Sequence, residues 1–284
     1  MMEGLFNFYG ALSDLLYQVP AGRVTTAEIL ADALGDSAAR RAVLEAMRAG
    51  PLNEHSPRVL DEPSGALSPF NDFETDHPLR GLAELQRSLS ARVVEEDAFD
   101  SAELVAGVDA AYSEDGAFGA CVVVDEDLRV VESSSVSLEA GFPYVPGYLA
   151  FREAPVVMLA ARSVAEYGVL LVNGHGVAHP RGCGLASFVG VELDAPTVGV
   201  ARGLLVGEVG VSRGGWAPVV HLGDVVGAEL RAEGLSPIYV SVGHRVSLPS
   251  CVEIVRGLRV GGGLPEPLKL AHVMAEEARK RAPS

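Results

Sequence analysis

The sequence predicts an α/β protein in which a small helical N-terminal unit precedes a mixed β-sheet flanked by helices. Residues 1–60 carry apolar residues at helical spacing between glycine and proline stops. Residues 104–137 then contain three β-rich runs separated by short turns, and helical and strand-like segments alternate after them. With 284 residues and 48% hydrophobic content, the chain can bury one large core or two smaller ones.

Three short helices are expected in the N-terminal unit. Apolar residues at positions 8, 12, 15, 16 and 19 share one helical face, and Pro20 ends that helix. A threonine can begin a second helix over residues 27–34, which ends at Gly35, and a third follows over 38–49. Helices joined by a tight glycine turn indicate a helix-turn-helix shape.

This unit resembles the DNA-binding half of alkylguanine-DNA alkyltransferases and alkyltransferase-like proteins, through VPAGRVTT (19–26), AARRAV (38–43) and the Gly-Pro pair at 50–51. The resemblance matches Arg41 to the arginine that fills the space of a rotated nucleotide. Ser56 stands at the acceptor cysteine, and a serine hydroxyl supplies no thiolate, so alkyl transfer is excluded. A helical packing module without nucleic-acid contact is the alternative, because residues 1–65 hold five Arg and nine acidic residues.

The remainder of the chain is expected to form a second domain. Residues 63–80 are rich in turn formers and lack periodicity, which predicts a linker between domains 1–62 and 81–284. Strands are expected over 104–112, 119–124, 129–137, 169–172 and 197–200, and helices over 149–166 and 184–191.

Composition limits the function classes. The net charge of -16 argues against a broad basic surface, and since Lys269 and Lys280 are the only lysines, arginine would make most phosphate contacts. Cys121, Cys183 and Cys251 lie far apart, which predicts core residues without disulfide partners. The chain shows no signal-peptide pattern and no apolar run of membrane-spanning length, so we expect a soluble cytoplasmic protein.

An aromatic loop stands out at residues 142–153, FPYVPGYLAFRE. Pro143 and Pro146 fix their own φ angles and restrict the residues before them, so Tyr144 and Val145 are expected at the tip of a stiff loop. A tyrosine on such a tip can enter a stack of bases. The alternative is a turn whose aromatic side chains pack on their own domain.

Polar residues fall where strands and loops meet. Asp109 interrupts an otherwise apolar strand, and a carboxylate buried there without partners would cost several kcal/mol. Glu153 follows the aromatic loop, Asn173 ends a strand, and His179 lies in the glycine-rich loop after it. Ligands of α/β proteins bind at such strand ends.

These stretches resemble the endonuclease V family over about residues 82–280. The matching motifs are AGVDAAY (106–112), the loop 142–153, NGHGVAHPR (173–181), DAPTVGVA (194–201), GHRVSL (243–248) and PEP (265–267). The resemblance implies a ribonuclease H-like fold and a Mg²⁺ ion, with Mn²⁺ as a substitute. It implies hydrolysis of the second phosphodiester bond 3′ to inosine in DNA or RNA.

The resemblance also implies roles for individual residues. Asp109, Glu153 and Asn173 would hold the ion, since carboxylate and amide oxygens suit Mg²⁺, and His179 would orient the attacking water. Arg202 would take the place of a catalytic lysine. The nucleic-acid contacts would come from Pro143, Tyr144, Val145, Pro146, Gly174 and His244, to which the alkyltransferase resemblance adds Arg41.

Departures from the family pattern predict impaired cleavage. The family has aspartate at Asn173, histidine at Phe188 and lysine at Arg202, and an amide supplies less negative charge than a carboxylate. A damaged-base binding protein that does not cut is therefore the alternative, and a hydrolase of small phosphorylated substrates is a weaker third. Ordinary structural roles are expected for Asp194, as a cap, and for His77, His175, His221 and His272.

Overall fold

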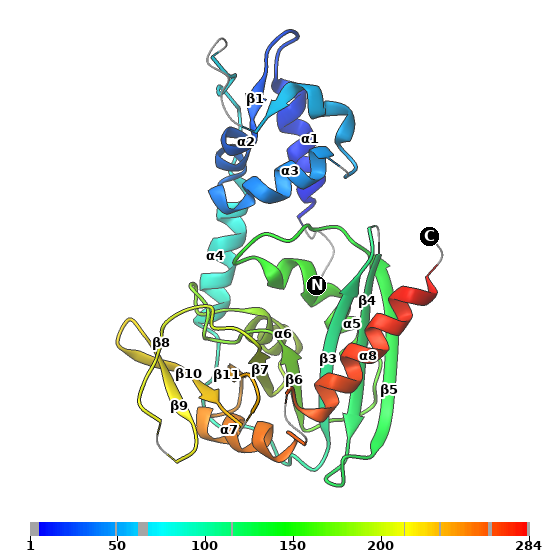
Figure 1. Ribbon diagram of the computed structural model, residues 1–284, viewed down its shortest axis with the longest axis vertical. Helices are drawn as coiled ribbons and strands as arrows, with labels where there is room; N and C mark the ends of the chain where they lie inside the picture. The colour runs from blue at the N-terminus through cyan, green and yellow to red at the C-terminus, as the bar shows by residue number, and fades with distance from the viewer. Residues whose placement is uncertain are drawn as a thin grey trace. The chain divides into compact units, whose positions relative to one another are not determined.

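The computed structural model describes residues 6–48, 50–61, 68–114, 116–212, 214–232, 234–260 and 263–282. It divides into two compact units (Figure 1). The first contains the described residues up to Leu85 together with the segment Gly141–Arg152. The second contains Gln86–Ala140 and the described residues from Glu153 onward.

Short helices and a minimal sheet form the first unit. Its elements are α1 (Phe8–Gln18), β1 (Thr25–Thr26), α2 (Ala27–Leu34), η1 (Ser37–Ala39), α3 (Arg40–Arg48), η2 (Asn53–Arg58), β2 (Val59–Leu60) and the start of α4 (Pro78–Ser90). The three predicted helices are confirmed, although the first turn of the third is a 3-10 helix. The two strands pair in parallel.

Capping residues set the helix boundaries in this unit. Asn7 Oδ1 accepts the Gly10 N–H at 3.0 Å at the start of α1, and Thr26 Oγ1 accepts the Ile29 N–H at 3.2 Å at the start of α2. Gly35 ends α2 with φ +106°, a left-handed conformation that a side chain would strain.

A nine-stranded mixed sheet forms the second unit, in the order β5-β4-β3-β6-β7-β11-β10-β9-β8. Its strands are β3 (Val105–Tyr112), β4 (Gly116–Val124), β5 (Val130–Glu139), β6 (Val169–Asn173), β7 (Thr197–Ala201), β8 (Glu208–Val209), β9 (Ala217–His221), β10 (Asp224–Leu230) and β11 (Ile238–His244). The pairs β3–β6 and β6–β7 are parallel, and the other pairs are antiparallel. The strands expected from the sequence, and a mixed sheet, are thus confirmed.

Helices pack on the sheet where glycines permit a close approach. The helices are α5 (Leu149–Arg162), α6 (Leu185–Leu193), α7 (Leu248–Gly257) and α8 (Glu266–Arg281). A Cβ at Gly107 would lie 2.5 Å from the carbonyl carbon of Pro267, so α8 can contact β3 only because residue 107 is glycine. A Cβ at Gly119 would lie 2.6 Å from the Val156 oxygen of α5. Figure 1 shows α8 running along β3 and β4.

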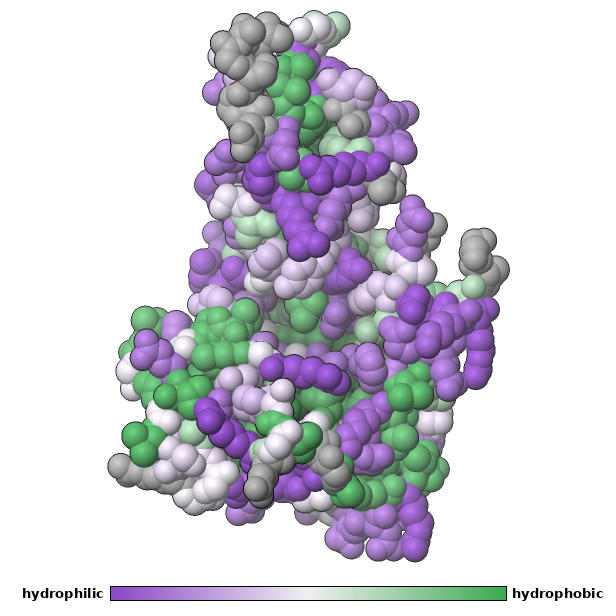
Figure 2. Space-filling model, in the orientation of Figure 1, coloured by the Kyte–Doolittle hydropathy of each residue, from purple (hydrophilic) through white to green (hydrophobic). Residues whose placement is uncertain are grey.

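The core of the second unit contains Cys251, and Cys121 and Cys183 are buried as well, which confirms their expected role as core residues. Figure 2 shows apolar side chains gathered over the β8–β10 edge of the sheet, where Leu222 and Val225 are exposed. Among the described residues, no helix is both long and apolar enough to cross a bilayer.

Candidate active site

The pairing of two neighbouring strands brings Asp109 and Asn173 together. β3 and β6 run in parallel with Val108 opposite Val172, so the next residue of each strand lies side by side. The Asn173 amide nitrogen donates to Asp109 Oδ1 at 2.9 Å. Two positions that are far apart in the chain thus meet at the end of β6.

The second oxygen of Asp109 contacts α8. His272 Nδ1 lies 2.7 Å from Asp109 Oδ2, and the close approach of α8 at Gly107 places that helix over the face of β3 that carries Asp109. Since Asp109 accepts, the proton of the imidazole is assigned to Nδ1. Asp109 is 4% exposed, whereas 49% of the His272 side chain is exposed.

This arrangement accounts for a carboxylate within an apolar strand. Both oxygens of Asp109 accept a hydrogen bond, so its burial does not leave an unsatisfied charge. The two contacts also fix the orientation of the carboxylate. An oriented carboxylate beside an exposed imidazole can bind a cation or direct a water molecule.

His272 lies at the surface, as expected, but its hydrogen bond to Asp109 was not foreseen. Its signal was available in the sequence: it follows Pro265-Glu266-Pro267, a motif that matched the family, at a distance of about one and a half helical turns. Apart from this position after the motif, nothing distinguished it from the other histidines. The contact arises only when α8 packs on β3.

Glu153 lies on α5, at the point where the chain passes from the first unit into the second, and it is half-buried. Among the described residues, no three His, Cys, Asp or Glu side chains are grouped closely enough to hold a metal ion. Glu153 therefore does not join Asp109 and His272 in such a group. Its predicted place beside Asp109 and Asn173 stays a prediction.

The loop that carries His179 is fastened by a buried glutamine. His179 is 6% exposed, and its Nδ1 accepts the Arg181 N–H at 3.2 Å. Gln86 is fully buried; its Oε1 accepts from Arg181 Nε at 2.8 Å, and its Nε2 donates to the Cys183 oxygen at 2.8 Å. Gln86 thus holds this loop from α4, a role that the sequence did not reveal.

The aromatic loop presents one of its predicted tip residues and buries the other. Tyr144 is 50% exposed, whereas Val145 is fully buried and Pro143 is buried. The expectation that Val145 lies at the tip was wrong, and burial likewise removes Pro143 from direct contact with nucleic acid. Pro146 is exposed. The exposed surface of the loop therefore consists mainly of Tyr144 and Pro146.

His244 does not suit the nucleic-acid contact expected of it. It ends β11 with 4% of its surface exposed, and its Nδ1 accepts the Val94 N–H at 3.2 Å. Burial, followed by the nearby Arg245 guanidinium, lowers the pKa of His244. Asp194 ends α6 in a left-handed conformation, φ +53°, which confirms its role as a cap.

The other predicted residues take simpler positions. Arg202 follows β7 directly and is exposed, and Phe188 is buried within α6. Gly174 is buried, and a Cβ there would lie 3.1 Å from the Leu185 Cβ. The catalytic and binding roles of these residues stay predictions.

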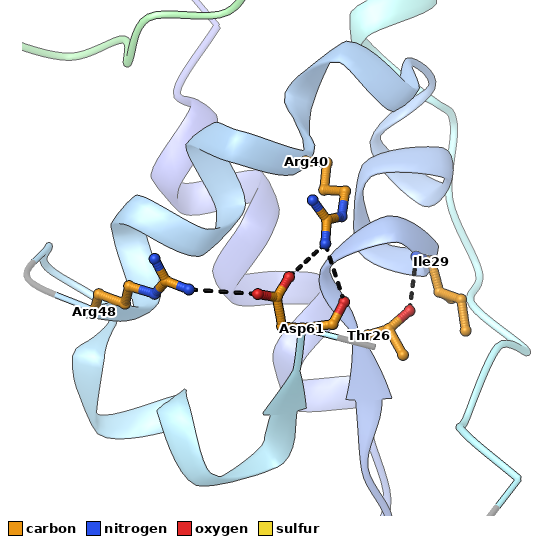
Figure 3. Close-up of polar contacts among 5 residues, drawn as sticks. All are labelled: Thr26, Ile29, Arg40, Arg48 and Asp61. Atoms are coloured by element: carbon orange, nitrogen blue, oxygen red, sulfur yellow. Dashed lines mark hydrogen bonds and ion pairs between the residues drawn. The ribbon is translucent and has the colours of Figure 1, made fainter. Parts of the chain in front are cut away.

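The arginines of α3 already have carboxylate partners. Arg40 and Arg48 both contact Asp61, which follows β2; the Arg48 Nη2 to Asp61 Oδ2 distance is 3.4 Å (Figure 3). Arg41 Nε donates to Glu45 Oε1 at 2.7 Å, and 78% of the Arg41 side chain is exposed. Such exposed pairs are weak, so a phosphate could compete for Arg41.

Most of the chain after residue 86 matches known nucleases in sequence. Residues 87–273 match the family model described as Endonuclease V. An Endonuclease V from Roseiflexus castenholzii is 42% identical over 214 residues, which cover 72% of this chain and 96% of the relative. One from Thermofilum pendens is 46% identical over 199 residues, covering 67% of this chain and 84% of the relative.

Solved structures agree with these relatives. The Endonuclease V of Streptomyces avermitilis is 37% identical, with a TM-score of 0.66, and the match covers 73% of this chain and 94% of that one. The Ciona intestinalis Endonuclease V, in complex with a 24mer DNA containing an inosine followed by a ribo-adenosine, is 26% identical with a TM-score of 0.65, covering 73% and 99%. The family match begins at residue 87, so the alkyltransferase resemblance of the N-terminal unit stays a prediction.

Proposed function

The chain belongs to the endonuclease V family of phosphodiester hydrolases, and on that premise we propose that it recognises inosine in DNA or RNA and hydrolyses the second phosphodiester bond on its 3′ side. The observation that carries the proposal is the buried Asp109 carboxylate, held between Asn173 and His272. The inosine-containing DNA bound by the Ciona intestinalis relative supports the choice of substrate.

Each residue of this cluster has a distinct task. Asp109 is the anionic centre, because its buried carboxylate lies within β3 beside the end of β6. Asn173 and His272 orient it, one through each oxygen, at 2.9 and 2.7 Å. His179, whose Nδ1 accepts the Arg181 N–H, would orient the attacking water by donating the proton on its Nε2.

The residues of the cluster supply the oxygen ligands that a hard divalent cation prefers, but their orientation in the structure does not fit a cation. Carboxylate and amide oxygens are the ligands that Mg²⁺ and Mn²⁺ prefer. The Asn173 amide, however, directs its N–H at Asp109, and Glu153 is not grouped with Asp109 and His272. A cation would require Asn173 to turn and present its Oδ1. This requirement is the physical basis for impaired metal binding and slower cleavage.

Base recognition would depend on the aromatic loop. Tyr144, exposed at the loop surface, would fill the space left when inosine leaves the base stack. Gly174, next to Asn173, lets α6 pack closely against it, because a Cβ there would lie 3.1 Å from the Leu185 Cβ, and its backbone would contact the extruded base. The same arrangement serves DNA or RNA.

The hydrogen bond from Asn173 to Asp109 also favours a second candidate function. The Asn173 N–H donates a hydrogen bond to the Asp109 carboxylate, which a cation would otherwise coordinate, so the carboxylate is stabilised without metal. A protein with such a site could bind inosine-containing strands without cutting them.

A nicking assay separates the two functions. Inosine-containing DNA and RNA strands, and adenosine controls, are incubated with Mn²⁺ and the wild-type chain, Asn173→Asp or Asp109→Ala. The nuclease requires inosine-dependent cleavage that Asp109→Ala abolishes and Asn173→Asp accelerates. If wild type and Asn173→Asp both bind inosine selectively but leave the strand intact, the chain is a binder. Loss of inosine selectivity in binding as well as cleavage refutes both.

A further inference from the structure

A segment from within the nuclease sequence packs with the N-terminal unit. Gly141–Arg152 lies inside the family match at 87–273, yet it forms one compact unit with the described residues up to Leu85. The region up to Leu85 lies wholly outside the match. The first unit therefore combines a family-specific loop with a region of no assigned task.

The C-terminal part of the loop is held by a polar contact. The Tyr148 side chain is 1% exposed, and its hydroxyl lies 2.7 Å from Asp36 Oδ2 and 3.3 Å from the Leu79 oxygen. The other oxygen of Asp36 accepts the Ala38 N–H at 2.9 Å and so caps η1. Asp36 thus has one fixed orientation, and a hydrogen bond to a charged acceptor is stronger than one between neutral groups.

The N-terminal part of the loop is held by aromatic packing. Phe142 is 5% exposed, and its ring centroid lies 5.7 Å from that of Phe8 and 6.2 Å from that of Phe6, both with edge-to-face geometry. Phe8 begins α1 and is fully buried. Arg152 Nη1 donates to the Phe142 oxygen at 2.9 Å, which ties the two ends of the loop together.

Tyr144 lies between these two fixed points and keeps half of its surface exposed. Arg41 of α3 belongs to the same unit, and 78% of its side chain is exposed. An exposed tyrosine and an exposed arginine on one unit are a combination suited to a base stack flanked by phosphate.

We propose that the N-terminal unit is a holder for the aromatic loop: Asp36 and Phe8 fix Tyr148 and Phe142, and thereby set the position from which Tyr144 enters the base stack. This role rests on the proposed recognition of inosine. Fixing the loop before binding avoids the entropy cost of ordering it on the nucleic acid, so the holder increases affinity for the substrate without touching the reacting bond. Asp36 and Tyr148 are accordingly positioning residues.

Two substitutions in the full-length chain test the holder. Tyr148→Phe removes only the hydroxyl, and Asp36→Ala removes its acceptor together with the η1 cap. Thr26→Ala is the matched control, because it removes the cap of α2, an N-cap in the same unit whose hydrogen bond goes to Ile29 (Figure 3). Asp36→Asn is the conservative variant, since its amide oxygen can still cap η1 and its nitrogen can donate to the Tyr148 hydroxyl.

The first measurement is hydrogen exchange of the loop amides without nucleic acid. The Tyr148 N–H bonds to the Val145 oxygen at 2.9 Å, and the Phe151 N–H bonds to the Tyr148 oxygen at 3.0 Å. We expect faster exchange of these amides in Tyr148→Phe and Asp36→Ala, and wild-type exchange in Thr26→Ala and Asp36→Asn.

The second measurement is the ratio of binding affinities for an inosine duplex and its adenosine control, with cleavage suppressed by a chelator. We expect the ratio to fall about tenfold in Tyr148→Phe and Asp36→Ala, as for loss of one hydrogen bond to a charged group. The double variant should lose no more than either single one. An unchanged ratio in these variants overturns the holder.

Failure of the proposed function gives a different result. If the wild-type chain shows no preference for inosine, the proposed recognition of inosine is refuted. The hydrogen-exchange data alone then test the holder, and unchanged protection of the loop amides in Tyr148→Phe and Asp36→Ala overturns it.

Discussion

Asn173→Asp is expected to destabilise the chain in the absence of divalent cations. In the wild type, Asn173 Nδ2 lies 2.9 Å from Asp109 Oδ1, so the substitution replaces a donor–acceptor contact with two facing carboxylates. The lost hydrogen bond to a charged acceptor is worth about 1.5–3 kcal/mol. Repulsion between unit charges at ~4 Å adds at most about 4 kcal/mol at an effective dielectric constant of ~20.

Uptake of a proton by one carboxylate relieves much of this repulsion. We therefore expect a net loss of about 3 kcal/mol, which for a unit of this size lowers the unfolding temperature by roughly 6–12 °C. Excess Mn²⁺ should reverse the loss, because a cation between the carboxylates replaces the missing N–H. The wild type, whose amide already satisfies Asp109, should respond much less.

Calorimetry of the full-length chain at neutral pH, first with a chelator and then with Mn²⁺, measures both effects. Asn7→Asp is the control, because Asn7 caps α1 and a carboxylate is equally suitable at that helix N-terminus. If Asn173→Asp unfolds at the wild-type temperature in chelator and does not respond to Mn²⁺, the assigned contact between residues 173 and 109 is wrong.

Three further substitutions test the supports of the site. Gly107→Ala should cost about 1–3 kcal/mol of unfolding free energy and weaken cleavage by displacing α8, whereas Gly81→Ala, where a Cβ meets no neighbour, should be neutral or slightly stabilising in the same calorimetric scan. Gln86→Ala should lower the free energy of unfolding by about 1–3 kcal/mol, because two buried hydrogen bonds are lost. If Gln86→Ala and Arg87→Ala, a substitution at an exposed residue, have equal unfolding free energies, this prediction is wrong. Burial lowers the pKa of His244, so protonation of this histidine favours the unfolded chain. The free energy of unfolding of the wild type should therefore fall as the pH drops below about 6.5. Unfolding followed by circular dichroism should show a smaller fall in His244→Asn.

Sequence patterns located most elements from residue 8 to about residue 200 and drew attention to Asp109. Apolar runs bounded by turn residues located β3 and β6, because burial and turn formation are local requirements. Asp109 could be singled out because a lone carboxylate in an apolar strand needs partners. The loop at 142–153 was recognisable because two prolines restrict its backbone.

The identity of those partners, and which loop residues are exposed, depend on the tertiary structure. Asn173 reaches Asp109 through the register of two parallel strands, and His272 reaches it because Gly107 lets α8 approach β3. Val145 is fully buried although it lies next to the half-exposed Tyr144, between the same two prolines. Register, helix docking and burial depend on residues distant in the chain, so no local pattern contains them, and these contacts build the candidate site.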